Sequence, residues 1–159
     1  MAVVAPSLPG AAVWYAERGH LVFPLRPDTK IPATRNGFKD ASMDPDTIRA
    51  WWRENPRYNI GLSTGHLFDV IDIDGPDGIV SIAAIEDEGL LPAIIGRVLT
   101  PGDEREQRPP GMHLLVTPTG DGCATRIRPG IDYRGIGGYV VAPPSLINGV
   151  PYRWTQPMA

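Results

Sequence analysis

The sequence predicts an α+β fold with a mixed or antiparallel sheet, and two observations support this prediction. Helical and strand-like patterns alternate in the first half of the chain, whereas the second half consists of strand-like segments separated by turns. Glycine and proline, 18 residues each among 159, exceed their usual share, which favours many short elements over a helical bundle. We expect one domain over residues 10–155, after a disordered lead-in over residues 1–9.

Three helices are predicted along the chain. The first covers residues 10–18. The second begins after Asp44, whose side chain can cap a helix, with Pro45 at the first helical position. The third covers residues 77–88 and begins with Asp77 as its cap. The residues that this third helix would turn toward the core are Ile79, Ile82, Ala83 and Ile85.

The remaining elements are predicted strands and one long loop. The strand-like segments cover residues 21–25, 59–62, 67–73, 97–100, 112–117, 131–133, 139–142 and 152–154. Pro24 indicates that the first of them lies at a sheet edge, because proline cannot donate to a neighbouring strand. The stretch 101–110 is the most charged in the sequence, and we expect it to be a mobile loop.

Composition and charge exclude several classes of protein. The net charge is −3, so no global basic field favours nucleic acids or membranes, and a polyanion would have to meet a local patch. No apolar run approaches the roughly 20 residues of a membrane span, and the first residues lack the basic region of a signal peptide. The single cysteine, Cys123, excludes an internal disulfide and a cysteine-based zinc site. A cytoplasmic protein is expected.

The most informative stretch contains two aspartates at the end of a strongly apolar strand. Asp72 and Asp74 are two residues apart, so they share one face of the strand while the alternate isoleucines face the core. Carboxylates held side by side repel each other unless a cation lies between them, and Mg²⁺ and Mn²⁺ prefer such oxygen ligands. The alternative is that both aspartates are solvated or form a turn. Asp69, on the opposite face, and Asp77 are not expected to be ligands.

Two further positions can carry chemistry. His113 begins an apolar strand, where it can donate to a phosphate oxygen, act as a general base, or be a half-buried structural residue. Asp132 and Arg134 share a strand face and place a carboxylate beside a guanidinium that can grip phosphate. An ordinary surface ion pair beside a hairpin is the alternative. Arginines gather in the last third, either as a positive surface or as a solvated face; they are Arg126, Arg128, Arg134 and Arg153.

The order of these motifs resembles a known family. Asp72-x-Asp74, then Gly-x-His113, then apolar-Asp132 resemble the three-motif signature of archaeo-eukaryotic primases. More narrowly, the sequence resembles the bifunctional primase–polymerase (Prim-Pol) domain of phage and plasmid replication proteins. The resemblance spans residues 11–154, and its most specific part is the string from Asp132-x-Arg134-Gly135 to Pro143-Pro144-Ser145.

The resemblance implies an RRM-like catalytic sheet with flanking helices and a template-directed DNA polymerase and primase activity. Asp72, Asp74 and Asp132 would hold two divalent ions, Mg²⁺ or Mn²⁺. The residues implied around the nucleotide are His113 and Arg134 at the phosphates and, as weaker candidates, Lys30, Asn59 and Ser63. Implied partners are a DNA template and primer, nucleoside triphosphates, and an accessory helical or helicase domain of a longer parent chain. The isolated domain is expected to be a monomer.

One departure and two alternatives accompany this interpretation. Family members usually run from Thr-Pro almost directly into Gly-Gly-x-His, whereas here the charged loop 103–110 intervenes and Pro110 replaces the second glycine. A metal-dependent nuclease or rolling-circle initiator would need a catalytic tyrosine and usually a His-apolar-His pair, and only His113 stands in the relevant strand. A non-catalytic binding module would have to tolerate three like charges without a metal, which is unfavourable.

Overall fold

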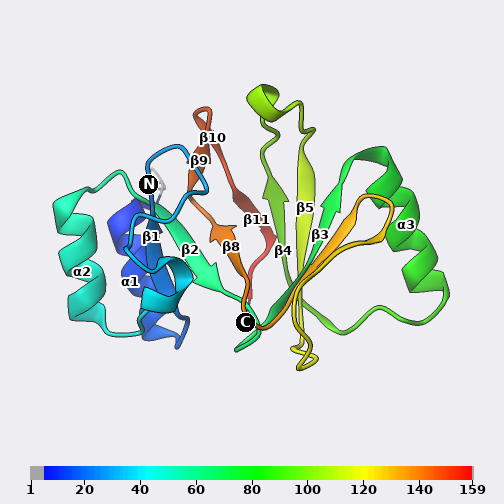
Figure 1. The fold of residues 1–159 in the computed structure, drawn as a ribbon, viewed down its shortest axis with the longest axis horizontal. Helices are drawn as coiled ribbons and strands as arrows, with labels where there is room; N and C mark the ends of the chain where they lie inside the picture. Colours follow the sequence, from blue (N-terminus) through cyan, green and yellow to red (C-terminus); the bar gives the residue numbers. More distant parts are fainter. Residues whose placement is uncertain (1–5, 159) are drawn as a thin grey trace, which may run out of the picture. The chain divides into compact units, whose positions relative to one another are not determined.

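The computed structural model describes residues 6–158 and has three α-helices among them, together with mostly antiparallel sheets (Figure 1). The predicted α+β class is therefore confirmed. The chain forms two compact units. The first unit contains the residues up to Ser63 and Val141–Pro151, and the second contains Thr64–Val140 and the segment from Tyr152 onward.

The first unit begins with helix α1, Leu8–Glu17, which the Ser7 side chain caps by accepting a hydrogen bond from the Gly10 amide at 3.1 Å. The helix thus starts two residues before the predicted position. Residues 8 and 9 belong to it rather than to a disordered lead-in, while residues 1–5 of that lead-in lie outside the described residues. Helix α2, Pro45–Glu54, is capped by Asp44 as predicted.

The sheet of the first unit has the order β1-β2-β8, so β1 is an edge strand, as Pro24 indicates. The bounds are β1 Val22–Leu25, β2 Asn59–Ser63 and β8 Tyr139–Ala142. The smaller elements of this unit are the 3₁₀ helix η1, Gly37–Asp40, and the two-residue strands β9, Leu146–Ile147, and β10, Val150–Pro151. Helices α1 and α2 lie side by side (Figure 1) and bury Tyr15 and Trp52.

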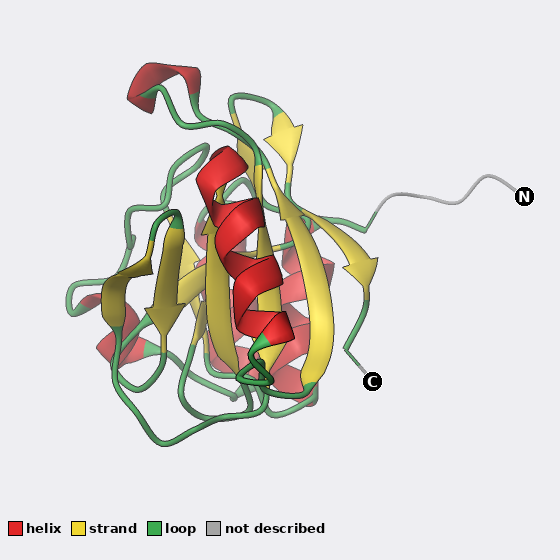
Figure 2. Ribbon diagram, turned by 90° about the vertical axis from the view of Figure 1, so that its right-hand side faces the viewer, coloured by secondary structure: helices red, strands yellow, loops and turns green. Residues whose placement is uncertain are grey.

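The second unit is built on a six-stranded antiparallel sheet with the order β11-β4-β5-β3-β7-β6. Its strands are β3 Asp69–Asp74, β4 Ile94–Thr100, β5 Gly111–Val116, β6 Ala124–Arg128, β7 Ile131–Arg134 and β11 Arg153–Gln156. Helix α3, Gly75–Asp87, lies across one face of this sheet (Figure 2). The core of that face contains Ile71, Ile73, Leu114, Val116 and Ile131.

Half of the inward face predicted for α3 is confirmed. Ile85 is buried and Ile82 packs against the core, whereas Ile79 is 66% exposed and Ala83 is also exposed. The helix begins at Gly75, so Asp77 lies in its first turn and is not its cap. The backbone before β7 packs directly against α3, and the Ser81 hydroxyl donates to the Pro129 carbonyl at 2.6 Å. The small residues Gly78 and Ser81 therefore take inward positions at the start of the helix.

The charged stretch 101–110 forms a closed hairpin tip between β4 and β5. The Asp103 amide donates to the Arg108 carbonyl at 2.8 Å, and the Arg108 amide donates to the Asp103 carbonyl at 2.9 Å. The 3₁₀ helix η2, Glu104–Glu106, lies between these two residues. Sequence patterns missed η2, β6 and the β9–β10 pair, which are short or exposed. No helix among residues 6–158 is long and apolar enough to cross a membrane.

Candidate active site

The strand register brings three of the predicted residues into one row across the sheet of the second unit. Strand β3 lies between β5 and β7, and Asp72 is directly opposite His113 on one side and Asp132 on the other. Side chains alternate between the faces of a sheet, so these three residues share the face opposite to Ile71 and Ile73. The shared face thus extends across β5, β3 and β7.

Hydrogen bonds and ion pairs fix the side chains of this row. His113 Nε2 lies 3.5 Å from Asp72 Oδ1, and the two side chains are 10% and 21% exposed. Arg134 Nη2 lies 3.2 Å from Asp132 Oδ2. Asp132 Oδ1 accepts a hydrogen bond of 2.8 Å from the Arg126 amide, which an irregularity in β6 with a positive φ of 47° at Arg126 turns toward it.

Asp74 joins this group through a pocket. An open pocket of about 640 Å³ is lined by Asp74 and Asp132, together with Asp77 and Arg126. Asp77 was not expected at the site, and its position follows from the early start of α3 at Gly75. The Asp74 amide donates to the Gly130 carbonyl at 2.8 Å, which ties the end of β3 to the turn before β7.

The residues present fit divalent cations in their chemistry. Asp72 and Asp132 are directly opposed like charges, and Asp74 and Asp132 line one pocket, so a hard cation beside these carboxylates would relieve their repulsion. Among residues 6–158, however, no three His, Cys, Asp or Glu side chains are already arranged as metal ligands. Asp132 accepts hydrogen bonds on both oxygens. To ligate an ion, Asp132 would therefore have to share one of these oxygens with it or release one of the two hydrogen bonds.

Sequence patterns missed two residues beside this row. Tyr152 is 2% exposed, and its ring centroid lies 6.1 Å from that of His113. Burial raises the pKa of Tyr152 to about 12, against the opposing effect of a hydrogen bond with Arg108. Arg108 comes from the hairpin tip between β4 and β5. For Arg108, the only indication in the sequence was its place in the inserted loop. For Tyr152, at the start of a short strand-like segment, nothing in the sequence indicated a place beside the site.

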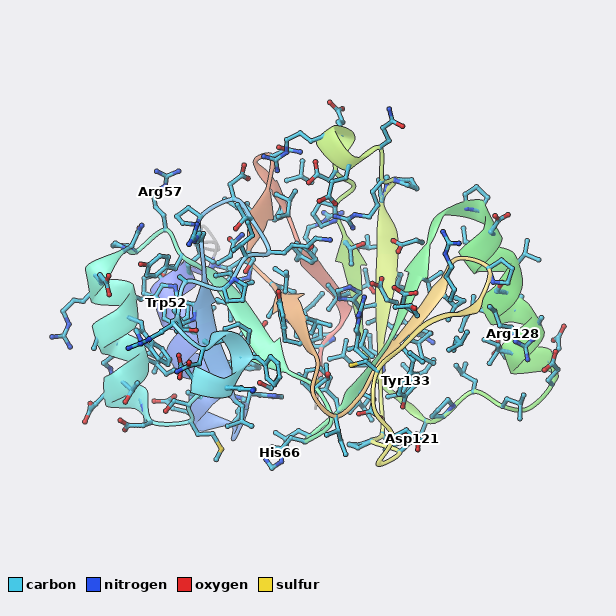
Figure 3. All side chains as sticks on the ribbon, in the orientation of Figure 1. Trp52, Arg57, His66, Asp121, Arg128 and Tyr133 are labelled. Atoms are coloured by element: carbon cyan, nitrogen blue, oxygen red, sulfur yellow. The ribbon has the colours of Figure 1, made fainter. Side chains whose placement is uncertain are left out.

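Two of the four arginines of the last third are paired with carboxylates. Arg128 makes two hydrogen bonds of 2.8 and 2.6 Å to Glu88 beyond the end of α3 (Figure 3). This contact raises the pKa of Arg128 and lowers that of Glu88. Arg134 is paired with Asp132, whereas Arg126 and Arg153 are exposed. The residues available for phosphate are therefore fewer than the sequence indicates.

The three weaker nucleotide-binding candidates belong to the first unit. The Asn59 side chain is buried, and its amide donates to the carbonyls of Thr29 and Leu146 at 3.0 and 2.8 Å. Its oxygen accepts from the Leu146 amide at 3.0 Å, so these bonds give it a structural role. Lys30 lies in the loop after β1, and Ser63 ends β2. Contacts of all three with a nucleotide stay predictions.

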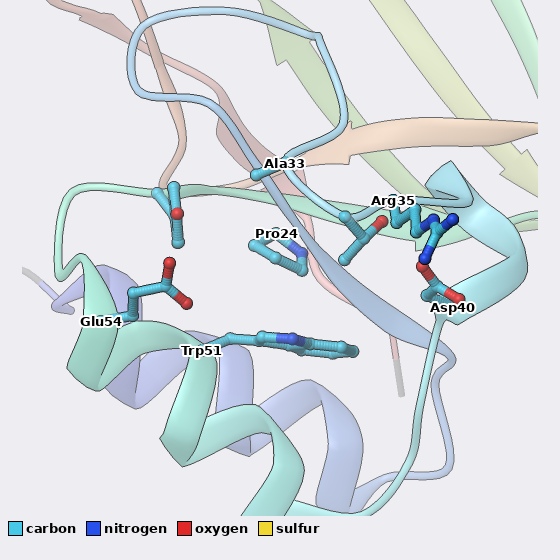
Figure 4. Close-up of a pocket in the computed structure, with 8 residues that line it drawn as sticks. Pro24, Ala33, Arg35, Asp40, Trp51 and Glu54 are labelled. Atoms are coloured by element: carbon cyan, nitrogen blue, oxygen red, sulfur yellow. The ribbon is translucent and has the colours of Figure 1, made fainter.

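A second pocket lies wholly within the first unit and contains none of the predicted site residues. It has a volume of about 410 Å³ and includes Pro24, Arg35, Asp40 and Trp51 in its lining. Figure 4 shows the Trp51 indole below the Pro24 ring, with Arg35 beside Asp40. Hydrogen bonds from Asn36 lower the pKa of Asp40. This pocket contains two carboxylates, Asp40 and Glu54, whereas the pocket of the second unit contains three, Asp74, Asp77 and Asp132.

An α+β protein with opposed carboxylates and a histidine on one sheet face fits the class of DNA primases and polymerases. The family model described as bifunctional DNA primase/polymerase, N-terminal, matches residues 12–159, and the chain belongs to this family. A comparison with curated proteins finds no match. The family membership supports a nucleotidyltransferase-type DNA primase or polymerase activity.

Proposed function

We propose that this chain transfers nucleotides to a primer under the direction of a DNA template, by a two-metal mechanism, in phage or plasmid DNA replication. The observation that carries the proposal is the position of Asp72, which lies in register between His113 and Asp132 on one sheet face. The same site would start chains without a primer if it acts as a primase. The cytoplasm is the expected compartment.

Each residue of the site has a role in this reaction. Asp72, Asp74 and Asp132 would hold two Mg²⁺ or Mn²⁺ ions. When bound, such ions acidify the primer 3′-hydroxyl and neutralise charge on the departing pyrophosphate. The 3′-oxygen bonds to the α-phosphorus, the bond to pyrophosphate breaks, and the hydroxyl proton passes to solvent. His113 would donate a hydrogen bond to a phosphate oxygen, and Arg134 would take up negative charge on the triphosphate.

The decisive experiment is primer extension and de novo synthesis with labelled dNTPs and NTPs, in Mg²⁺ and in Mn²⁺. We expect Asp72→Asn and Asp132→Asn each to reduce incorporation by on the order of 10²–10³ or more, as when a group that stabilises transition-state charge is removed. Circular dichroism should show an unchanged fold. Asp121→Asn is the matched control, because it makes the same charge change at an exposed loop residue of the second unit (Figure 3). Normal extension by Asp72→Asn would refute the assignment.

Two alternative functions can be distinguished from the proposed one by experiment. A rolling-circle initiator would become covalently attached to DNA through a tyrosine. Tyr133 in β7 and Tyr152 just before β11 have pKa values raised to about 12, which disfavours the phenolate that such an attack requires. A non-catalytic module would bind neither a divalent cation nor a dNTP in calorimetric titration, or would bind without incorporation.

The proposed partners follow from the reaction. They are a DNA template and primer, nucleoside triphosphates, and an accessory helical or helicase domain in a longer parent chain. The net charge of −3 provides no global attraction to DNA. We therefore expect weak DNA binding by residues 1–159 alone, acting as a monomer, with the accessory domain supplying most of the affinity.

A further inference from the structure

The backbone of the hairpin tip holds Arg108 in a fixed position. Its amide and carbonyl are both paired with those of Asp103, at 2.9 and 2.8 Å. Asp103 is itself 6% exposed, and its side chain accepts a hydrogen bond of 3.0 Å from the Arg105 amide. This bond caps the short helix η2. Arg108 is therefore presented by an organised turn, and its side chain starts from a defined point.

The Arg108 guanidinium is mostly buried but incompletely satisfied. The side chain is 19% exposed, and within residues 6–158 its Nε and Nη2 atoms are buried and donate no hydrogen bond. The paired carboxylate, Glu106, approaches Nε only to 3.7 Å and is 65% exposed. Buried donors on a charged group are unfavourable without an acceptor, so an anion that reached this edge of the guanidinium would satisfy them.

Contacts through Tyr152 link the Arg108 side chain to the proposed catalytic row. Arg108 forms a hydrogen bond with Tyr152, whose pKa also responds to the charge of Asp72. The Tyr152 ring lies 6.1 Å from His113, and His113 lies 3.5 Å from Asp72. A short series of contacts within the second unit thus connects Arg108 with Asp72.

We propose that Arg108 binds a phosphate group beside Asp72 and His113. Nε and Nη2 form one edge of the guanidinium, and this edge matches two oxygens of a phosphate. The phosphate can belong to the polyphosphate of a nucleotide or to a DNA backbone. The inference rests on the proposed function in one respect, namely that a phosphorylated substrate reaches this row.

Arg108 differs from the other arginines near it. Arg134 is committed to Asp132 at 3.2 Å, and Arg105 is committed to Asp103 at 3.2 Å with its side chain 56% exposed. Arg105 therefore provides a matched control. Substitution by glutamine makes the same charge change in the same loop, without touching the buried edge that we assign to phosphate.

The test is calorimetric titration of the wild type, Arg108→Gln, Arg108→Lys and Arg105→Gln. The probes are inorganic tripolyphosphate, dATP and an oligothymidylate without a terminal phosphate, in Mg²⁺. We expect Arg108→Gln to lower the affinity for the phosphate-bearing probe roughly tenfold to a hundredfold, as for the loss of charge-assisted hydrogen bonds. Arg108→Lys keeps the charge but cannot make a bidentate contact, so its affinity should be intermediate. The affinity of Arg105→Gln should match that of the wild type. If only the affinities for tripolyphosphate and dATP fall, the phosphate belongs to a nucleotide. If only the affinity for the oligothymidylate falls, the phosphate belongs to the DNA backbone.

Thermal melting distinguishes binding from a structural role. If the role of Arg108 is to bind phosphate, the ligand-free Arg108→Gln protein should melt at or above the wild-type temperature, since the variant buries fewer unsatisfied donors. Its stabilisation by the ligand should be reduced. Equal affinities of wild type and Arg108→Gln for all three probes would overturn the inference, as would a wild type that binds none of them.

The two proposals fail in different ways. Arg108-dependent phosphate binding without nucleotide incorporation by the wild type would refute the proposed polymerase activity and leave the phosphate site standing. If incorporation is lost in Asp72→Asn while Arg108→Gln keeps wild-type ligand affinities, the phosphate site is refuted and the proposed polymerase activity is supported.

Discussion

Asp69 and Tyr133 form a hydrogen-bonded pair on the core side of the sheet, opposite to Asp72. Asp69 is fully buried, and its Oδ2 accepts hydrogen bonds from the Tyr133 hydroxyl and from the Thr119 amide, the latter at 2.9 Å. Burial first, and then the hydrogen bond with Asp69, raise the pKa of Tyr133 to about 12. The pair explains a buried aspartate that takes no part in the proposed site.

This pair predicts a loss of stability at alkaline pH. Unfolded tyrosine titrates near pH ~10, whereas the folded Tyr133 and Tyr152 titrate at about 12. The folded state therefore binds more protons in that interval, and the free energy of unfolding should fall as pH rises from about 10 to about 12. Urea unfolding across this range measures the slope.

Substitution isolates the contribution of Tyr133. Tyr133→Phe should flatten the alkaline slope, and at neutral pH it should cost roughly 1–3 kcal/mol because buried Asp69 loses a donor. Tyr152→Phe should flatten the slope independently. An unchanged slope in the double variant would contradict the assignment of alkaline instability to these two tyrosines.

Individual site residues were predictable from the sequence to different degrees. Asp72 and Asp132 could be assigned because strand parity fixes the face on which each carboxylate lies. Tyr152 and Arg108 could not be identified, since Tyr152 reaches His113 from the segment before β11 and Arg108 reaches Tyr152 from the hairpin tip, and neither contact follows a repeating pattern. The three hydrogen bonds of the buried Asn59 side chain could not be predicted either, because their partners Thr29 and Leu146 are distant in the sequence.

Among the elements, α3 and the turn before β7 make an unusually close contact. A Cβ on Gly78 would lie 2.7 Å from the Gly130 carbonyl oxygen, and a Cβ on Gly130 would lie 2.3 Å from the Gly78 nitrogen. Gly130 also has a positive φ of 73°, which favours glycine. The contact holds the start of α3 against β7, and it places Asp74 and Asp132 in the same pocket.

Gly130→Ala should therefore destabilise the second unit strongly. The positive φ costs roughly 1–2 kcal/mol, and the backbone overlap should add about 1–3 kcal/mol. Gly120→Ala is the control, because Gly120 has a φ of 86° but no atom within 4 Å of the added Cβ. It should show only the backbone cost. Equal free energies of unfolding for the two variants would argue against the close contact.

The same contact explains why only half of the inward face of α3 was predicted. The sequence periodicity placed Ile79 inward with Ile82 and Ile85, yet at the start of the helix the neighbouring backbone leaves space only for Gly78 and Ser81. Apolar periodicity indicates which residues can be buried, whereas the approach of another backbone decides which ones are. In α2, by contrast, the larger side chains of Ile48 and Trp52 are the buried ones.

On the scale of the whole molecule, the first unit is completed by residues that come late in the chain. Val141–Pro151 belong to it, although Thr64–Val140 intervene. The Tyr15 hydroxyl donates to the Pro143 carbonyl at 2.7 Å, and the Ile60 amide donates to Ser145 Oγ at 2.8 Å. The first unit therefore cannot be finished until most of the chain is available.

A chain that ends at Val140 should lose the fold of the first unit. It would lack part of β8 and the partners of Tyr15 and Ile60, which leaves buried polar groups unsatisfied. Hydrogen exchange of the Ile60 amide should change from protected to fast, and unfolding should lose cooperativity. A chain that ends at Gln156 keeps every strand and should retain protection. Protection of Ile60 in the shorter chain would show that the first unit folds without its late segment.

The position of Asp72 between two antiparallel neighbours has a consequence for which length changes the chain can tolerate. Inserting one residue inside β5 or β7 would exchange the two faces of that strand, sending His113 or Asp132 into the apolar core. The hairpin tip between Thr100 and Gly111 lies beyond the last paired residues, so its length can vary without moving any carboxylate. New substrate contacts such as Arg108 can therefore be acquired there, one insertion at a time, around an unchanged centre.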